Sequence, residues 1–157
     1  MESVLKPFLE LFREIYIGSE FEQTWIIDGT PGYGFTTTIK QITAKMASTP
    51  MVEGGSTIAG HTEHLRWSLE FAMTFYKGQQ PSGSWEESWR IRKVNNKEWE
   101  ELQLALLIAY QNLVNAIREV NDWSNPSLLK GTLALLPHAA YHLGAVKQLI
   151  IAVHEHK

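Results

Sequence analysis

Two pairs of histidines have a spacing that would let them hold a metal ion. His138 and His142 are four residues apart, so on a helix both imidazoles lie on one face and can point at a common ion. A divalent cation held by imidazole usually takes at least three protein ligands, with open positions left if it does chemistry. His61 and His64 form the second pair and could supply a third ligand from another helix. The residues therefore indicate an interhelical metal site, with hydrogen-bonded core histidines as the alternative.

The neighbours of His138 and His142 strengthen the case for a metal site against simple core packing. Both residues lie in an apolar stretch that extends from Leu135 to Ile150. An imidazole buried among such side chains needs a partner for its polar nitrogens. A metal ion would supply that partner.

The composition limits the classes of function that the chain can serve. With 157 residues, 44% of them hydrophobic, we expect a single compact domain over residues 1–157. A net charge of −3 argues against binding to nucleic acid or to an anionic membrane surface. The chain has no cysteine, which excludes disulfides, thiolate ligands and a cysteine nucleophile. No apolar run is long enough for a membrane span, and the start does not resemble a secretory signal, so we expect a cytoplasmic protein.

Hydrophobic spacing predicts four long amphipathic helices. The first ends at about Gly18, and the second begins after an N-cap at Ser56 or Thr57 and ends at Lys77-Gly78. The third extends from Trp99 to Val120, and the last follows a turn at residues 121–126, with Ser127 as its N-cap. We therefore expect an all-α fold, a four-helix bundle with a long decorated connection between the first and second long helices.

The connections contain smaller features. Residues 28–34 are rich in turn formers, and we expect Trp25, Ile26 and Ile27 just before them to pack onto the helices. A short helix is expected over residues 36–48. The polar connection over residues 79–96 holds Trp85 and Trp89, which would cover apolar surface or line a pocket.

Two segments resemble signatures of the DinB-like superfamily of small metal-binding four-helix bundles. Thr57 to Leu65 resembles the family's second-helix signature, in which a hydroxyl residue and small residues lead to histidine-leucine. Pro137 to Gly144 resembles its last-helix signature, H-x-x-Y-H followed by one residue and glycine. The resemblance covers nearly the whole chain. It departs at Ala145, where many relatives have glutamine or glutamate, so any polar role of that side chain is missing here.

The resemblance implies a metal centre and a reaction. Its metal ligands fall on His64, His138 and His142, which would hold a divalent metal, zinc or nickel, with the remaining positions open. Several relatives are thiol-dependent S-transferases or isomerases, and many form homodimers. We therefore expect a metal-dependent S-transferase that uses a low-molecular-weight thiol as cosubstrate and acts on a small electrophile. The resemblance assigns no catalytic side chain.

Two other functions fit the same residues. A metal-dependent hydrolase would activate water, and Glu63 is the carboxylate beside the histidines, although a pairing with Arg66 explains it better than a role as general base. A non-catalytic, metal-stabilised bundle would bind a ligand or serve a stress response, and a fourth protein ligand would support it. His61 could be that ligand, the partner of a ligand, or a base. His154 and His156 lie in a tail that we expect to be solvated.

Overall fold

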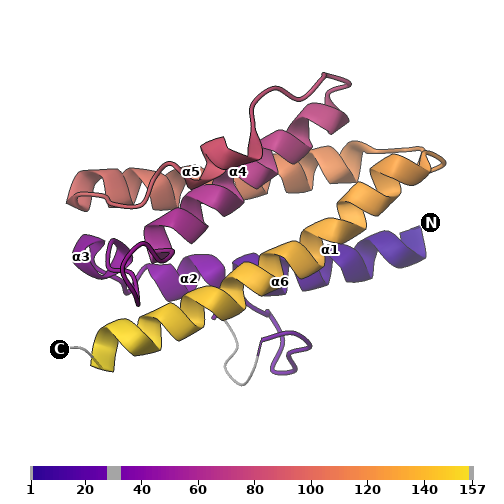
Figure 1. Cartoon of the computed structure of the whole chain (residues 1–157). Coiled ribbons are helices and arrows are strands. Elements are labelled where there is room, and N and C mark those ends of the chain that lie inside the picture. The colour runs from indigo at the N-terminus through magenta and orange to yellow at the C-terminus, as the bar shows by residue number, and fades with distance from the viewer. Residues whose placement is uncertain (1, 28–32, 156–157) are drawn as a thin grey trace.

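The chain folds into helices. The computed structural model describes residues 2–27 and 33–155, and within them it contains helices and connections but no strand (Figure 1). The four long helices are α1 (Glu2–Tyr16), α4 (Ile58–Tyr76), α5 (Asn96–Glu119) and α6 (Pro126–Glu155). The short helices are α2 (Phe35–Ile39) and α3 (Ala44–Ala47), which lie between α1 and α4, and the 3-10 helix η1 (Trp85–Trp89), which lies between α4 and α5. The prediction of an all-α fold is confirmed for the described residues.

Each long helix contacts two of the others. α4 packs against α5 and α6, and α6 also packs against α1. α5 meets α1 through Tyr110, whose ring centroid lies 5.4 Å from that of Phe12 and 5.1 Å from that of Tyr16. Figure 1 shows α4 and α6 on the same side of the molecule, where they contact each other. This packing brings the two histidine-bearing helices together although they are far apart in the sequence.

All four long helices contribute apolar side chains to one core. These side chains recur at intervals of three or four residues, so each helix turns one stripe inward. Fully buried examples from the four helices are Phe12, Leu65, Leu69, Leu106, Leu113, Ala139 and Val146.

The starts of α4 and α6 show how the sequence fixes the helix ends. Thr57 caps α4, because its hydroxyl accepts a hydrogen bond from the amide of Gly60 at 3.0 Å. The expectation that Ser127 caps α6 is wrong. The side-chain oxygen of Asn125 accepts from the amide of Ser127 at 3.0 Å. Pro126 is the first residue of α6, a position that suits proline, so the capping residue is the one before it.

The single short helix expected over residues 36–48 is also wrong. α2 and α3 are separate helices, and Thr43 lies at the start of α3. Its hydroxyl accepts from the amide of Met46 at 3.3 Å. Threonine favours such a capping position over a helix interior because its hydroxyl can then satisfy an unpaired amide.

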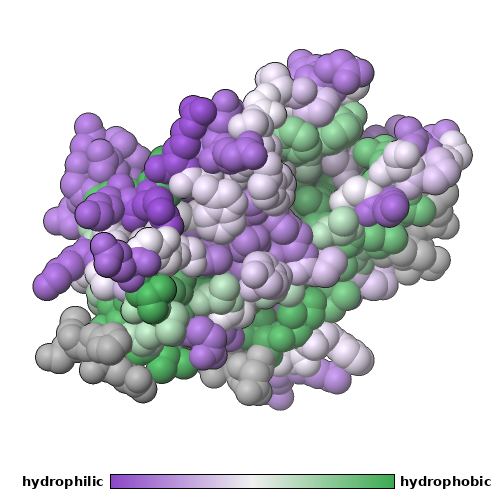
Figure 2. Space-filling view, viewed as in Figure 1, coloured by the Kyte–Doolittle hydropathy of each residue, from purple (hydrophilic) through white to green (hydrophobic). Residues whose placement is uncertain are grey.

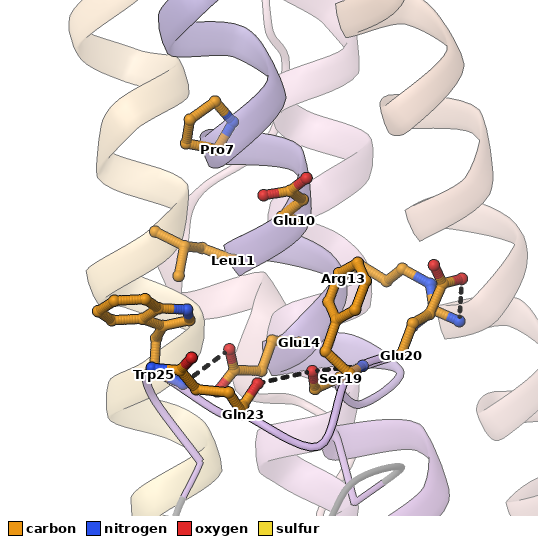
Figure 3. A pocket seen from close by; sticks show the side chains of 10 residues that line it. Pro7, Glu10, Leu11, Arg13, Glu14, Ser19, Glu20, Gln23 and Trp25 are labelled. Carbon is orange, nitrogen blue, oxygen red and sulfur yellow. Dashed lines mark hydrogen bonds and ion pairs between the residues drawn. The ribbon is translucent and has the colours of Figure 1, made fainter.

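Glu14 anchors the segment that follows α1 (Figure 3). Its carboxylate is buried and accepts hydrogen bonds from the amides of Trp25, Ile26 and Ile27, at 2.9, 2.6 and 2.8 Å. Only Ile27 of these three residues is buried, whereas the Trp25 side chain is 76% exposed. The expected packing of this segment is therefore correct for Ile27 and wrong for Trp25, because the backbone rather than the indole holds the segment. Residues 28–32 of the expected turn lie outside the described residues.

α6 is the longest helix and carries two of the predicted ligands. It continues through Pro137, so the missing proline amide removes one backbone hydrogen bond without ending the helix. Neither α6 nor another described helix combines the length and apolar character that a membrane crossing requires.

Candidate metal centre

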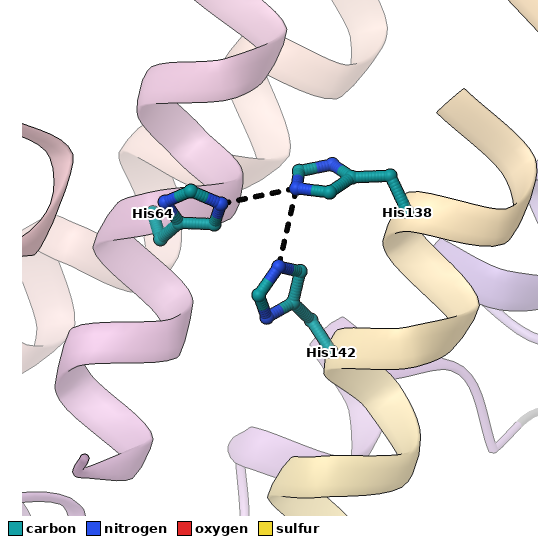
Figure 4. Close-up of side chains that lie close together, drawn as sticks. All are labelled: His64, His138 and His142. Atoms are coloured by element: carbon teal, nitrogen blue, oxygen red, sulfur yellow. Dashed lines mark hydrogen bonds between the residues drawn. The ribbon is translucent and has the colours of Figure 1, made fainter. Parts of the chain in front are cut away.

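Three histidines from α4 and α6 converge on one point (Figure 4). His64 comes from α4, and His138 and His142 come from successive turns of α6. The Nε2 atom of His138 lies 3.0 Å from Nε2 of His64 and 3.1 Å from Nε2 of His142. One ring nitrogen of each residue lies within 4.8 Å of the others. The structure thus brings together the three residues that the resemblance selected as ligands.

The separations between these nitrogens fit a shared divalent ion. Zinc–imidazole bonds are about 2.0–2.1 Å long. Two nitrogens at that distance from one ion would be about 2.8–3.0 Å apart at a 90° angle and about 3.3–3.4 Å apart at the tetrahedral angle. The two separations, 3.0 and 3.1 Å, are close to this range. His64, His138 and His142 are therefore suited to bind one face of a metal ion through their Nε2 atoms.

Ser88 determines which nitrogen of His64 is free. The Ser88 hydroxyl donates its proton to the carbonyl of Trp85 at 2.6 Å. The same oxygen lies 2.7 Å from Nδ1 of His64, and because the serine proton is already used, His64 must donate from Nδ1. The lone pair of neutral His64 is then on Nε2, directed at the other two histidines. Ser88 therefore orients His64 in the way that outer partners orient metal-bound histidines.

His61 contacts His142 from the side away from the triad. Nδ1 of His61 lies 2.8 Å from Nδ1 of His142, and Nε2 of His61 lies 3.0 Å from the hydroxyl of Ser56. If Nε2 of His142 carries the lone pair, its Nδ1 proton goes to His61, which in turn directs its own proton at Ser56. This chain fits His61 as the partner of a ligand and leaves both of its nitrogens outside the three-nitrogen cluster.

The buried histidines are poised to stay neutral. Burial lowers the pKa of His61 to about 4. Burial and the neighbouring imidazoles lower the pKa of His64 to about 4 and that of His142 to about 3. The pKa of His138 is also lowered by burial. Neutral imidazole is the form that binds metal, so near pH 7 the triad needs no deprotonation before it can bind.

Two tryptophans of η1 cover the triad. The Trp89 ring stacks on His64, with centroids 4.3 Å apart and planes 19° apart. Trp85 meets the same imidazole edge-on, with centroids 4.6 Å apart. These residues were expected to cover apolar surface or to line a pocket; both contact the His64 imidazole, and Trp85 also lines a groove. The tryptophans shield the site from water on the side of η1 and thereby strengthen electrostatic interactions within it.

The remaining predicted residues lie apart from the cluster. Glu63 accepts two hydrogen bonds from Arg66, at 2.6 and 2.7 Å. The expected pairing is therefore present, although Glu63 is buried rather than exposed. His154 is exposed near the end of α6, and His156 lies outside the described residues. Sequence reasoning considered Ser56 only as a helix cap and did not single out Ser88, because nothing in the local sequence connects either serine with a histidine of the cluster.

Comparisons of the chain with protein-family models, with curated proteins and with solved structures found no match. Within the described residues, the histidine triad is the group of side chains that could hold a metal ion.

Proposed function

We propose that the protein is a metal-dependent enzyme in which His64, His138 and His142 hold a divalent ion. The observation that carries this proposal is the convergence of three Nε2 atoms. That of His138 lies 3.0 Å from that of His64 and 3.1 Å from that of His142. Three neutral imidazoles suit zinc or nickel, among other first-row metals. Because no carboxylate or thiolate joins the described cluster, the bound ion would keep its full positive charge for chemistry.

The proposed reaction is the transfer of a low-molecular-weight thiol to a small electrophile. A bound divalent cation lowers the pKa of a thiol and favours its thiolate near neutral pH. The thiol proton is released to solvent, and the sulfur forms a bond to an electrophilic carbon while the leaving group departs with its electron pair. Ser88 would keep the ligand His64 oriented during this step, and Trp85 and Trp89 would exclude water from one side.

The lack of a fourth protein ligand beside His64, His138 and His142 within the described residues supports an enzyme over a metal-stabilised structural protein. A structural site is usually closed by four protein ligands. The nearest candidate for a fourth ligand, His61, directs its nitrogens at His142 and Ser56. On the other side, His138 is only half-buried and borders a groove between α4 and α6. A substrate therefore has an approach to the ion beside His138.

The position of Glu63 supports thiol transfer over hydrolysis. A hydrolase of this kind would use a carboxylate as general base toward a metal-bound water. Glu63 is held by Arg66 through two hydrogen bonds, and burial together with this pairing makes it costly to move the carboxylate. A thiol needs no such base once its pKa is lowered.

We also propose that the chain is a member of the DinB-like superfamily and that its four long helices form a four-helix bundle. The helix contacts support the bundle. α1 packs against α6, α6 against α4 and α4 against α5, and Tyr110 of α5 contacts Phe12 of α1. A cytoplasmic location would provide the reduced thiol. Pairing into a homodimer is proposed from the resemblance, and exposed aromatic side chains such as Trp25 offer surface for it.

Elemental analysis of the untagged protein tests the metal centre. We expect about one zinc or nickel ion per chain and its loss in His64→Ala and His142→Ala. His154→Ala is the matched control, because His154 is an exposed histidine on the same helix as His142. Circular dichroism checks that the variants remain helical. If the parent takes up no divalent metal even on titration, the proposal is rejected.

A second measurement tests the reaction. The metal-loaded protein is assayed with a model electrophile such as 1-chloro-2,4-dinitrobenzene, with and without an added thiol. We expect thiol-dependent product that disappears in His64→Ala and persists in His154→Ala. Turnover of an electrophile that proceeds equally well without any thiol would instead identify a hydrolase.

A further inference from the structure

An apolar groove begins at the triad and follows α6 toward its N-terminus. Its volume is about 520 Å³, within the range of small-molecule sites. His138 and Trp85 border one end, and Asn125 and Ser127 border the other. From His138 to Ser127 the groove extends over roughly 16 Å of helix. Because His138 belongs to both, the groove and the candidate metal centre form one continuous site.

The walls of the groove are mainly hydrocarbon. Its apolar lining comes from α4 and α6 and includes Phe71, Ala72, Phe75, Leu128, Ala134 and Leu135. The described lining residues contain no lysine, arginine, aspartate or glutamate. Figure 2 shows hydrophobic surface gathered over this end of α4 and the facing part of α6. Phe75 is 52% exposed and Trp85 is 55% exposed, so an apolar ligand would remove this surface from water.

Two hydroxyls that line the groove, those of Tyr76 and Thr132, are already hydrogen-bonded. Thr132 donates its hydroxyl proton to the carbonyl of Leu128 at 2.8 Å. Tyr76 forms a short hydrogen bond with the Thr132 oxygen, and since the threonine proton is used, Tyr76 is the donor. Neither hydroxyl therefore has a proton left for a ligand. This arrangement favours a hydrocarbon chain over a sugar or nucleotide, which would need several donors.

We infer that the groove binds the hydrocarbon part of the small electrophile, an alkyl or arylalkyl group, with the reactive end beside His138. The nature of that reactive end rests on the proposed function, whereas binding of the chain depends only on the groove. The substrate is thus an elongated amphiphile and not a compact polar molecule.

Two metal-binding probes of different chain length test the inference on the zinc-loaded protein. Acetohydroxamate and octanohydroxamate share the head group that binds zinc and differ in their alkyl chain. Each fully buried methylene contributes about fourfold in affinity. With about half of the added chain buried, octanohydroxamate should bind roughly sixtyfold more tightly by calorimetry.

Two glycines of α6 provide a matched pair of variants. Gly131 lines the groove, whereas Gly144 does not. A Cβ at either position meets no atom within 4 Å, and leucine suits a helix better than glycine, so both Gly131→Leu and Gly144→Leu should fold. We expect Gly131→Leu to lose at least about tenfold of the chain-length advantage and to bind acetohydroxamate like the parent. Gly144→Leu should retain the full advantage.

A metal-free arm separates this inference from the proposed function. Octan-1-ol is titrated into protein stripped with a chelator, and we expect weaker binding in Gly131→Leu than in the parent or Gly144→Leu. If this pattern holds but no state of the protein binds zinc, the groove inference stands and the proposed metal chemistry fails. If zinc binds but both hydroxamates bind equally, the groove inference is overturned and the metal centre stands. A dimer that only Gly131→Leu dissociates, without a chain-length effect, would identify the groove as a protein interface and also overturn it.

Discussion

The hydroxyl of Ser88 determines which nitrogen of His64 carries the proton and so bears directly on the proposed metal centre. Its own proton goes to the Trp85 carbonyl, so it accepts the Nδ1 proton of His64. In Ser88→Ala this proton loses its partner, and the imidazole is free to rotate or change tautomer. Partners of this kind typically contribute about 10–100-fold to metal affinity.

We therefore predict that Ser88→Ala binds zinc about 10–100-fold more weakly than the parent, with helical content unchanged. Competition with a chromophoric chelator measures the affinity. Ser82→Ala is the control, because Ser82 is an exposed serine in the same connection. Equal zinc affinity in Ser88→Ala and the parent would show that Ser88 does not orient His64.

The three candidate ligands could be predicted from the sequence, but the residues that contact them could not. The spacing of His138 and His142 indicates a shared face, and the resemblance adds His64 as the third ligand. Spacing says nothing about Ser88, because its contact with His64 depends on how η1 folds back over α4. The same holds for His61. Its place on the inner face of α4 follows from the periodicity of the sequence, whereas its contact with His142 depends on how α4 packs against α6.

The segment that follows α1 has no helix or strand over residues 25–27, and the Glu14 side chain accepts its backbone hydrogen bonds instead. The segment after α1 has three consecutive amides that point at one buried carboxylate. We predict that Glu14→Ala destabilises the fold by about 1–3 kcal/mol, the typical cost of leaving buried hydrogen-bonding groups unpaired. Urea unfolding of the metal-free protein measures this change.

Two related variants interpret that result. Glu14→Gln should lose less stability than Glu14→Ala, because the amide oxygen can still accept from the backbone. Glu10→Ala should be close to neutral, because Glu10 is exposed and its ion pair with Lys6 is long at 3.9 Å. Similar losses in all three variants would show that the anchored segment does not account for the change. The affinity for zinc should not change in any of them, since the segment does not contact the triad.

Elements with strong periodicity were predicted well, and irregular ones were not. A cap at Ser56 or Thr57 and the end of α4 near Gly78 follow from local chemistry that the sequence displays, and the structure selects Thr57 and gives Gly78 a φ of +63°. The bounds of the short helices between α1 and α4 cannot be predicted in this way. Thr43 can cap a helix or lie inside one, and its role depends on how the segment packs in the folded chain. The side chain of Trp25 was placed wrongly for a related reason: the bonds that hold its segment come from the backbone.

At the scale of the whole molecule, the neutral histidine cluster makes stability depend on pH. The folded-state pKa values of His61, His64 and His142 are lowered from 6.5 to about 4, 4 and 3. Below about pH 6.5 the unfolded chain therefore binds protons that the folded chain does not, and stability falls as the pH is lowered toward 4. The cost at pH 5.5 should be on the order of 1 kcal/mol for each such histidine.

We predict that the metal-free protein has a lower free energy of unfolding at pH 5.5 than at pH 7, measured by urea titration with a chelator present. His142→Asn should show a smaller difference between the two pH values, because it removes one of the titrating groups. His154→Asn is the control and should behave as the parent, since His154 is exposed. A stability that is constant between these pH values would contradict the neutral cluster.

The sequence separation within the triad makes a bound ion a reporter of folding. His138 and His142 lie on one helix, but His64 is 74 residues away from His138 along the chain. A partly folded chain that has formed only α6 can offer two imidazoles, and the third arrives when α4 docks against it. Cobalt(II) absorbs visible light more strongly as its coordination changes from six ligands to fewer. Its spectrum during refolding would therefore record the moment at which two distant parts of the chain meet.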